Sequence, residues 1–539
     1  MTFQPRTGII PLNKSPKVYG MNNMTNSLRA GKTPARTVLK LSLPAIIEQL
    51  MITCVSYIDT AMVGSLGKTA TAAIGVCSSF IWFVSGFVAA VALGFSVQTA
   101  QYFGAGRLDN ARETVRRSFL SIPAAGLPLA AAVCAVSFFL PGWMGAEEAV
   151  IPLARDYLFI IGISQVFLLG VNICSATLRS VGDTKTPMVF NTLLNVINII
   201  MNFFFIFQSR STVLFGTEIN VFGFGMGVAG AAIGSLIASA CTFIMYIVCI
   251  FFGKRAINPR LSPPTGNGGA ITGRAVRLGV PAFLERAAMS SGQILMTYLV
   301  TGLGSAAVSA NSLAVTAESI SYLPASGFSL AAAALIGQAV GAGEKELARR
   351  FAKISLVMGV CCLCVSGAVL YVFSDNLIGF FIDDAEVITL GGRMLRIVSF
   401  AEPFFAVSIV LSGVFRGVGN TKIGFFTGLI CMWGGRIVPA LFLVPRFGLD
   451  GAWYAMVIDL VLRAVVTMVF FLRPGWESGG VRVTAEEEPH GQDTAGITKK
   501  QSDTVPAVSL ILLTKPVSWK RWTLFFVEAE KKREEIVCK

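Results

Sequence analysis

The fold is decided by a short segment that occurs twice in the chain. Residues 101–106 read Gln-Tyr-Phe-Gly-Ala-Gly, and residues 338–343, at an offset of 237, read Gln-Ala-Val-Gly-Ala-Gly. Working outward, the same offset relates Arg-Ser-Val-Gly-Asp-Thr-Lys at 179–185 to Arg-Gly-Val-Gly-Asn-Thr-Lys at 416–422. It also relates Leu-Pro-Ala-Ile-Ile-Glu at 43–48 to Val-Pro-Ala-Phe-Leu-Glu at 280–285. A constant offset across four apolar segments cannot come from shared composition, so the chain contains two copies of one unit.

The segments that separate these motifs are long and apolar. The chain has 539 residues, of which 54% are hydrophobic and only 14% charged, whereas about a quarter of a soluble domain is charged. About 20 apolar residues cross a bilayer as a helix, and the helix satisfies backbone groups that lipid cannot. The predicted spans are 41–63, 70–102, 119–140, 152–178, 187–207, 227–252, 279–301, 307–340, 355–374, 389–414, 423–445 and 450–472.

The two copies have the same orientation in the membrane. After the fifth span the offset falls to 221, where Gly230 matches Gly451, so the first copy has a longer fifth connection at 208–226. Each copy then holds six spans, and an even number keeps the copies parallel, related by an axis along the membrane normal. The sequence therefore predicts an all-α membrane protein of twelve transmembrane helices in two six-helix lobes. The substrate is expected between the lobes.

Basic residues gather in alternate connections. The net charge is +14, which can suggest nucleic acid, but Lys and Arg concentrate after the even-numbered spans. Cytoplasmic loops carry such an excess. We therefore expect no nucleic-acid partner and both termini in the cytoplasm. We also expect a multi-pass protein of the plasma (inner) membrane that is surrounded by lipid and is monomeric. The residues are Arg107, Arg112, Arg116, Arg117, Arg179, Lys185, Lys254, Arg255, Arg260, Arg274, Arg277, Lys345, Arg349, Arg350, Lys353, Arg416 and Lys422.

These features divide the chain into five parts. They are a cytoplasmic tail at 1–39, a first lobe at 40–252, a cytoplasmic linker at 253–277, a second lobe at 278–472 and a largely disordered cytoplasmic tail at 473–539. The chain shows no Ser/His/Asp set, phosphate loop or metal-binding cluster, and its only histidine, His490, is in the tail. We therefore expect a transporter, with no catalytic residues and no cofactor. A channel or a structural membrane protein is the alternative, but the asymmetric placement of acids between the copies favours a carrier.

Acidic residues inside spans are candidates for function, because charge in mid-membrane is costly. They are Glu48, Asp59, Glu285, Glu318, Glu402 and Asp459. Asp459 lies four residues before Arg463, a spacing that predicts a structural ion pair. Arg436 is predicted to pair with an acid across the second lobe. Glu285 adjoins Arg286 near the predicted start of a span, so an interfacial position is an alternative for it.

Asp59 differs because no cation lies within a helical turn of it. Glu48 precedes it by eleven residues, about three turns, so both face one side. The fifth span carries Asn191, Asn195, Asn198 and Asn202, which form a polar stripe on one helical face. Such amides either join helices or, with the carboxylates, hold a proton or a hard cation such as Na⁺.

The second copy does not repeat the asparagine stripe. Its matching positions are Gly428, Met432, Gly435 and Pro439. Instead, its acids accompany helix breakers: Glu318 precedes Pro324 and Gly327, and Glu402 precedes Pro403. Proline within a span frees backbone carbonyls and permits a hinge.

These motifs together resemble the multidrug and toxic compound extrusion (MATE) family over about residues 40–472. The segments that carry the resemblance are 58–67, 101–106, 178–185, 324–328, 337–343 and 416–421. In that family a cation site in the first lobe draws on Asp, Asn and Thr side chains. Matched residue by residue, the resemblance implies cation coupling at Asp59, Asn198, Asn202 and Ser235, where Asn202 replaces an acid of many relatives and Ser235 a threonine. Asn311 also departs from the family pattern, which often has His or Gln nearby.

The resemblance implies a secondary active antiporter. It would export small organic, cationic or amphipathic compounds in exchange for H⁺ or Na⁺, with any Na⁺ held at Asp59. Substrate binding or second-lobe coupling would then involve Glu48, Glu285, Glu318 and Glu402. The alternative is a flippase for lipid-linked or oligosaccharide precursors, whose cavity is typically more cationic than the spans here.

Overall fold

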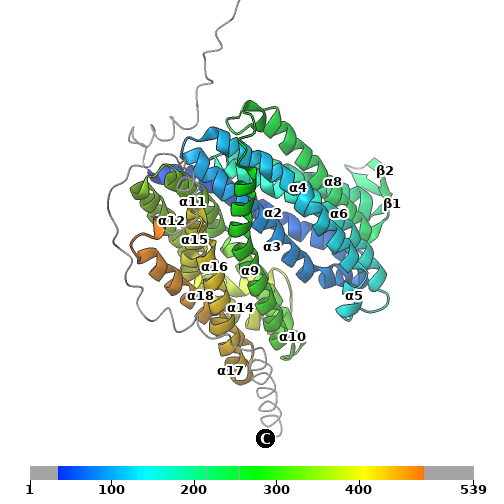
Figure 1. Cartoon of the computed structure of the whole chain (residues 1–539). Coiled ribbons are helices and arrows are strands. Elements are labelled where there is room, and N and C mark those ends of the chain that lie inside the picture. The colour runs from blue at the N-terminus through cyan, green and yellow to red at the C-terminus, as the bar shows by residue number, and fades with distance from the viewer. Residues whose placement is uncertain (1–33, 215–216, 254, 479–539) are drawn as a thin grey trace, which may run out of the picture. The chain divides into compact units, whose positions relative to one another are not determined.

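The chain forms two groups of helices, which Figure 1 shows in blue to green and in green to orange. The computed structural model describes residues 34–214, 217–253 and 255–478. The predictions for residues 1–33 and 479–539, including those for His490, lie outside this part.

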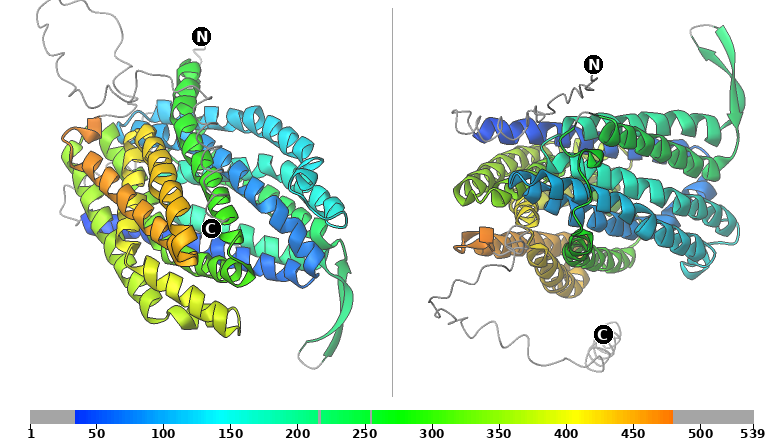
Figure 2. Two further views of the ribbon diagram at one scale, coloured as in Figure 1. Left: turned by 90° about the horizontal axis from the view of Figure 1, so that it is seen from below. Right: turned by 45° about the horizontal axis from the view of Figure 1, so that its top comes forward.

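The first lobe comprises the elements from α2 to α8. They are α2 (Pro34–Gly64), α3 (Lys68–Gly104), α4 (Leu108–Ser137), α5 (Leu140–Trp143), α6 (Ile151–Ser180), α7 (Lys185–Ile206), β1 (Gln208–Leu214), β2 (Thr217–Phe224) and α8 (Gly227–Phe251). The strands pair antiparallel and occupy the longer fifth connection that the sequence predicts. The hairpin extends from the bundle between α7 and α8 (Figure 2).

The second lobe comprises the elements from α9 to α18. They are α9 (Gly268–Thr301), α10 (Ser305–Ser321), α11 (Leu323–Gly341), α12 (Lys345–Val372), α13 (Ser374–Gly379), α14 (Ala385–Ser399), α15 (Glu402–Val418), α16 (Thr421–Ile430), a π-helical segment η2 (Cys431–Ile437), α17 (Val438–Phe447) and α18 (Leu449–Leu472). A 3₁₀ turn, η3 (Trp476–Ser478), follows.

The turns of the two lobes repeat in backbone geometry as well as in sequence. Three pairs of glycines 237 residues apart share a left-handed φ: Gly67 and Gly304 (106° and 99°), Gly106 and Gly343 (77° and 76°), and Gly182 and Gly419 (88° and 89°). Only glycine adopts this region freely. The two-copy architecture is therefore confirmed at the level of individual turns.

By length and composition, ten helices of the described part could cross a membrane, and the bent pair α14–α15 makes an eleventh. The remaining long helix, α9, carries four charged residues among 34. It occupies the position in the second copy that α2 has in the first, so the six-helix repeat is complete.

Two spans of the second lobe are broken next to the prolines that predict a break. One break lies at Tyr322, between α10 and α11, just before Pro324. The other lies before Pro403 and bends α14 against α15 by 59°. Proline removes a backbone donor and disfavours helix in the residue before it. The π-helical turn in the eleventh span was not predicted.

The predicted linker between the lobes is partly helical and is attached to the first lobe. α9 begins at Gly268, so the last ten residues of the predicted linker are helical. Arg112 donates to the Ala256 carbonyl at 2.9 Å. Arg255 pairs with Asp183. Burial alone would raise the pKa of Asp183, but hydrogen bonds from Arg255 and Thr186 outweigh it and lower that pKa.

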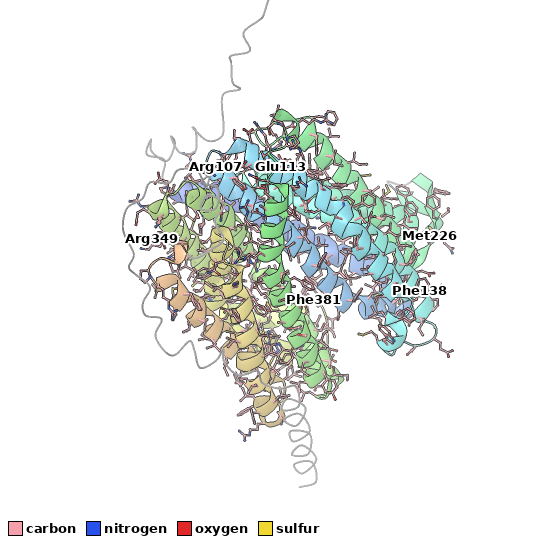
Figure 3. The ribbon with its side chains drawn as sticks, in the orientation of Figure 1. Arg107, Glu113, Phe138, Met226, Arg349 and Phe381 are labelled. Carbon is pink, nitrogen blue, oxygen red and sulfur yellow. The ribbon has the colours of Figure 1, made fainter. Side chains whose placement is uncertain are left out.

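The basic connections lie at one end of the bundle. Figure 3 shows Arg107, Glu113 and Arg349 toward one end and Phe138 and Met226 toward the other. This distribution matches the alternation of charge in the sequence. We call the end that carries Arg107 and Arg349 the basic end.

Candidate functional site

Asp59 lies in a polar cluster that joins three helices of the first lobe. Asn202 of α7 donates to the Asp59 carboxylate at 2.9 Å. The amide of Asn198 has one orientation in which both its nitrogen and its oxygen have hydrogen-bond partners. In that orientation the nitrogen lies 2.9 and 3.0 Å from the two oxygens of the Asp59 carboxylate. The Asn198 oxygen then accepts from the hydroxyl of Ser235, on α8, at 3.0 Å. The structure thus brings together the four residues for which the resemblance implies cation coupling.

One oxygen of this cluster has no hydrogen-bond donor in the described part of the chain. The Asn202 side chain is 1% exposed, and its Oδ1 atom is buried without a partner among the described residues. A Cβ on Gly234 of α8 would lie 2.1 Å from that oxygen, so only glycine leaves room for it. A buried amide oxygen without a partner costs about 1–3 kcal/mol. A proton donor or a hard cation at this position would remove that cost.

The asparagine stripe of α7 serves two clusters instead of one. Asn191 donates to Glu48 at 2.6 Å, and Arg179 of α6 pairs with the same carboxylate at 2.7 Å. Asn195 is buried, and its amide nitrogen has no partner in the described part of the chain. Glu48 and Asp59 do face the same helix, as the eleven-residue spacing predicts, but Glu48 belongs to an ion pair of the first lobe.

The Glu–Arg pair occurs again in the second lobe at the same offset. Glu285 lies 3.2 Å from Arg416. Glu285 lies near the middle of α9, which begins at Gly268. Gly428 replaces Asn191 in this copy and lies against Glu285.

The other acids predicted inside spans of the second lobe are buried. Glu402 is 0% exposed and accepts from Ser321 at 2.6 Å, which connects the breaks in the two interrupted spans. Glu318 is 4% exposed, and its Oε1 atom has no partner among the described residues. Asp459 pairs with Arg463 through two contacts of 2.8 Å, as predicted.

A small cavity inside the second lobe is lined by Arg436 of the π-helical segment, together with Asn311 and Trp453. The indole of Trp453 donates to Asn311 at 3.0 Å. No acidic oxygen of the described residues lies within 4 Å of Arg436, but Asp459 and Glu318 act on it electrostatically. Its Nε atom is buried without a partner among the described residues.

The lobes touch through a reciprocal contact at the basic end, which we call the inter-lobe latch. Gln101 of α3 donates to the Val418 carbonyl at 3.2 Å, and Gln338 of α11 donates to the Ser180 carbonyl at 2.7 Å. Gly104 and Gly341 permit α3 and α11 to cross closely, because a Cβ on either would lie 2.0 Å from a carbonyl of the other helix.

The latch was not recognised from the sequence as a functional element. The signal was present, because the repeated Gln-x-x-Gly-x-Gly motif supplies both the donors and the close-contact glycines. What sequence analysis could not show is that each copy of the motif contacts the other copy's lobe.

Comparison with known proteins gives the family. The MatE family model matches residues 44–204 and 281–442, together more than half of the chain and one match in each lobe. The chain is 26% identical over 453 residues to "Probable multidrug resistance protein NorM" of Thermotoga maritima, covering 83% of this chain and 94% of that protein. It is 25% identical to human "Multidrug and toxin extrusion protein 1", covering 84% and 76%.

Solved structures share the fold. A MATE crystal structure in the straight conformation matches with a TM-score of 0.75 at 20% identity, covering 85% of this chain and 98% of that one. An outward-facing multidrug resistance MATE transporter of the MOP superfamily matches with a TM-score of 0.74, also at 20% identity, covering 81% and 95%. With one family match in each lobe of a duplicated helical fold, the chain belongs to the MatE family, the multidrug and toxic compound extrusion transporters.

Proposed function

We propose that this protein is a secondary active antiporter that exports small organic compounds in exchange for H⁺ or Na⁺. The observation that carries the proposal is the Asp59 cluster, in which a carboxylate and the unpaired oxygen of Asn202 lie together in the first lobe. The names of the curated relatives, which refer to multidrug resistance and extrusion, support export of drug-like compounds.

Cation binding can reach the second lobe through α2. Tyr57, two residues before Asp59, donates to the Thr316 carbonyl of α10 at 3.2 Å and contacts Ser319 at the same distance. A cation at Asp59 changes the charge of the helix that makes this contact. It shifts the balance between two lobe arrangements by the difference between its affinities for them.

The basic end is the proposed cytoplasmic end, because cytoplasmic connections are enriched in Lys and Arg. The plasma membrane is the proposed location. Because the latch closes this end, the structure would then represent an outward-open arrangement, from which substrate leaves and cation enters.

The proposal is tested with the purified full-length protein in proteoliposomes. Transport of a fluorescent organic compound is measured with an imposed Na⁺ gradient, an imposed H⁺ gradient, and neither. We expect transport under one of the gradients and none without a gradient. Transport that ignores both gradients contradicts the antiporter. Scrambling of a fluorescent phospholipid without any added compound would favour the flippase.

Gly234→Ala tests the coordination at Asn202 without removing a polar group. The added methyl would meet Asn202 Oδ1 at 2.1 Å, so we expect the amide to rotate or shift and coupled transport to fall. Overpacking of this kind costs about 1–3 kcal/mol of stability. Gly75→Ala on α3 is the matched control, because nothing lies within 4 Å of its added methyl. Equal transport rates in the two variants would remove Asn202 from the proposed site.

A further inference from the structure

One face of α9 points toward the first lobe and carries a charged residue near the middle of the helix. Gly279, Arg286 and Gln293 are spaced by seven residues, close to two helical turns, and so share that face. A Cβ on Gly279 would lie 3.0 Å from the Ala90 carbonyl of α3. A Cβ on Gly86 of α3 would lie 2.4 Å from Cγ of Arg286. The stem of Arg286 therefore lies across a helix of the other lobe.

Next to this contact, side chains of both lobes are exposed. Arg286 and Gln293 are both exposed, as is Phe83 on the facing helix. A guanidinium near the middle of a 34-residue helix cannot face lipid at low cost. Its exposure beside the other lobe therefore indicates access to water in the space between the lobes.

The charge of Arg286 is not compensated by the described residues. It makes no ion pair or hydrogen bond there, and the groups that act on it electrostatically are Arg416, Glu285 and Tyr322. Glu285 already pairs with Arg416 at 3.2 Å. Two guanidinium groups therefore share one carboxylate, which leaves one positive charge in excess.

The first lobe lacks this excess charge. In its corresponding pair, Glu48 and Arg179 form an ion pair at 2.7 Å, so their charges cancel. The position that matches Arg286 is the neutral Gln49. Arg286 is thus not required by the repeated Glu–Arg pair itself. It is an addition specific to the second lobe, placed where the two lobes face each other.

Aromatic rings lie one helical turn from Arg286. Phe283, one turn before Arg286, packs edge-on against Phe83 and Phe87 of α3 at 5.3 and 5.7 Å between ring centres. Arginine pairs with a carboxylate through two parallel hydrogen bonds, and aromatic side chains bind an apolar body. The two features together suit a molecule that has an anionic group and a ring.

We propose that Arg286 is a substrate-recognition residue and that the exported compounds include organic anions, in particular aromatic carboxylates. This assignment rests on the proposed export function and differs from the cationic substrates that the sequence led us to expect. Gly86 supports the site by leaving room for the stem of Arg286.

The test compares two fluorescent compounds of similar size, an aromatic carboxylate and an organic cation, in proteoliposomes with the active gradient. The wild type is expected to transport the carboxylate. In Arg286→Gln we expect KM for the carboxylate to rise about tenfold to a hundredfold, the range for losing a charged hydrogen bond, with little change in transport of any cation. Gly86→Ala should also raise KM for the carboxylate, because its methyl group would displace the arginine. Arg277→Gln, an exposed residue of the same helix, is the control.

The outcomes separate this inference from the function on which it rests. Gradient-driven transport of the cation alone overturns the anion assignment and leaves the antiporter intact. A normal KM for the carboxylate in Arg286→Gln also overturns it, because the variant then demonstrably folds and transports. Failure of both compounds to move overturns the proposed function and this inference together. Arg286-dependent movement of a fluorescent phospholipid, with the carboxylate excluded, would assign the positive charge to a lipid headgroup and overturn the assignment.

Discussion

Asp59→Asn is expected to reduce gradient-driven export to the level of protein-free vesicles. The substitution keeps the size of the side chain and a hydrogen-bonding partner for Asn202, which lies 2.9 Å from the carboxylate. It removes the negative charge, which is the only charge among the four clustered residues Asp59, Asn198, Asn202 and Ser235. Without this charge, the cation affinities of the two lobe arrangements differ little, so a cation gradient cannot drive the transport cycle.

Two measurements accompany the transport assay. If Na⁺ is the coupling ion, it should raise the melting temperature of the wild type, because a ligand that binds the folded state stabilises it. The rise should vanish in Asp59→Asn. Asp375→Asn, which alters an acid that is about half exposed on α13, is the matched control. Wild-type transport by Asp59→Asn would transfer coupling to Glu318 or Glu402, the buried acids of the second lobe.

Gly341→Ala is expected to force the lobes apart at the basic end. The new methyl would lie 2.0 Å from the Gln101 carbonyl oxygen and 2.7 Å from the carbonyl carbon. These are backbone atoms, so no side-chain rotation relieves the clash. An overpacking cost of about 1–3 kcal/mol changes the ratio of the two lobe arrangements by roughly 5- to 150-fold. Gly104→Ala should act in the same way, because its contact with Gln338 is the mirror of this one.

The lobe separation can be measured by electron paramagnetic resonance between spin labels at Asp109 and Glu346. These residues are related by the repeat and expose 68% and 77% of their side chains. In a background without other reactive cysteines, Gly341→Ala should populate longer distances than the wild type. Gly273→Ala on α9 should not, since nothing lies within 4 Å of its methyl. An unchanged distance distribution in Gly341→Ala would show that the latch does not hold the closed end.

Most of the architecture could be predicted because it depends on local rules. Long apolar segments must be helical in lipid, and the constant offset of 237 places two equivalent lobes on one pattern. The breaks near Tyr322 and Pro403 follow from proline. The start of α9 could not be predicted from the apolar pattern, because the first turns of this helix are polar. The π-helical turn at Arg436 could not be predicted either.

The candidate site was predicted in part. The spacing of Glu48 and Asp59 correctly placed both acids on one face of α2, but spacing alone treated the asparagines of α7 as one group. In the structure Asn191 contacts Glu48, whereas Asn202 contacts Asp59. The set Asp59, Asn198, Asn202 and Ser235 came from family resemblance, and the structure shows these side chains in contact. Their role in coupling stays a prediction.

The sequence by itself determined the class of protein, the two-lobe repeat and the chemical types of residue inside the spans. Composition and periodicity are sufficient for these, because the membrane penalises exposed backbone and charge wherever they occur. Only the tertiary structure decided which charges are balanced. Glu48 and Glu285 each contact an arginine of another helix, whereas Arg286 forms no ion pair with the described residues and lies between the lobes. The reason is physical: these contacts join residues far apart in the chain, and their distances depend on how the helices pack.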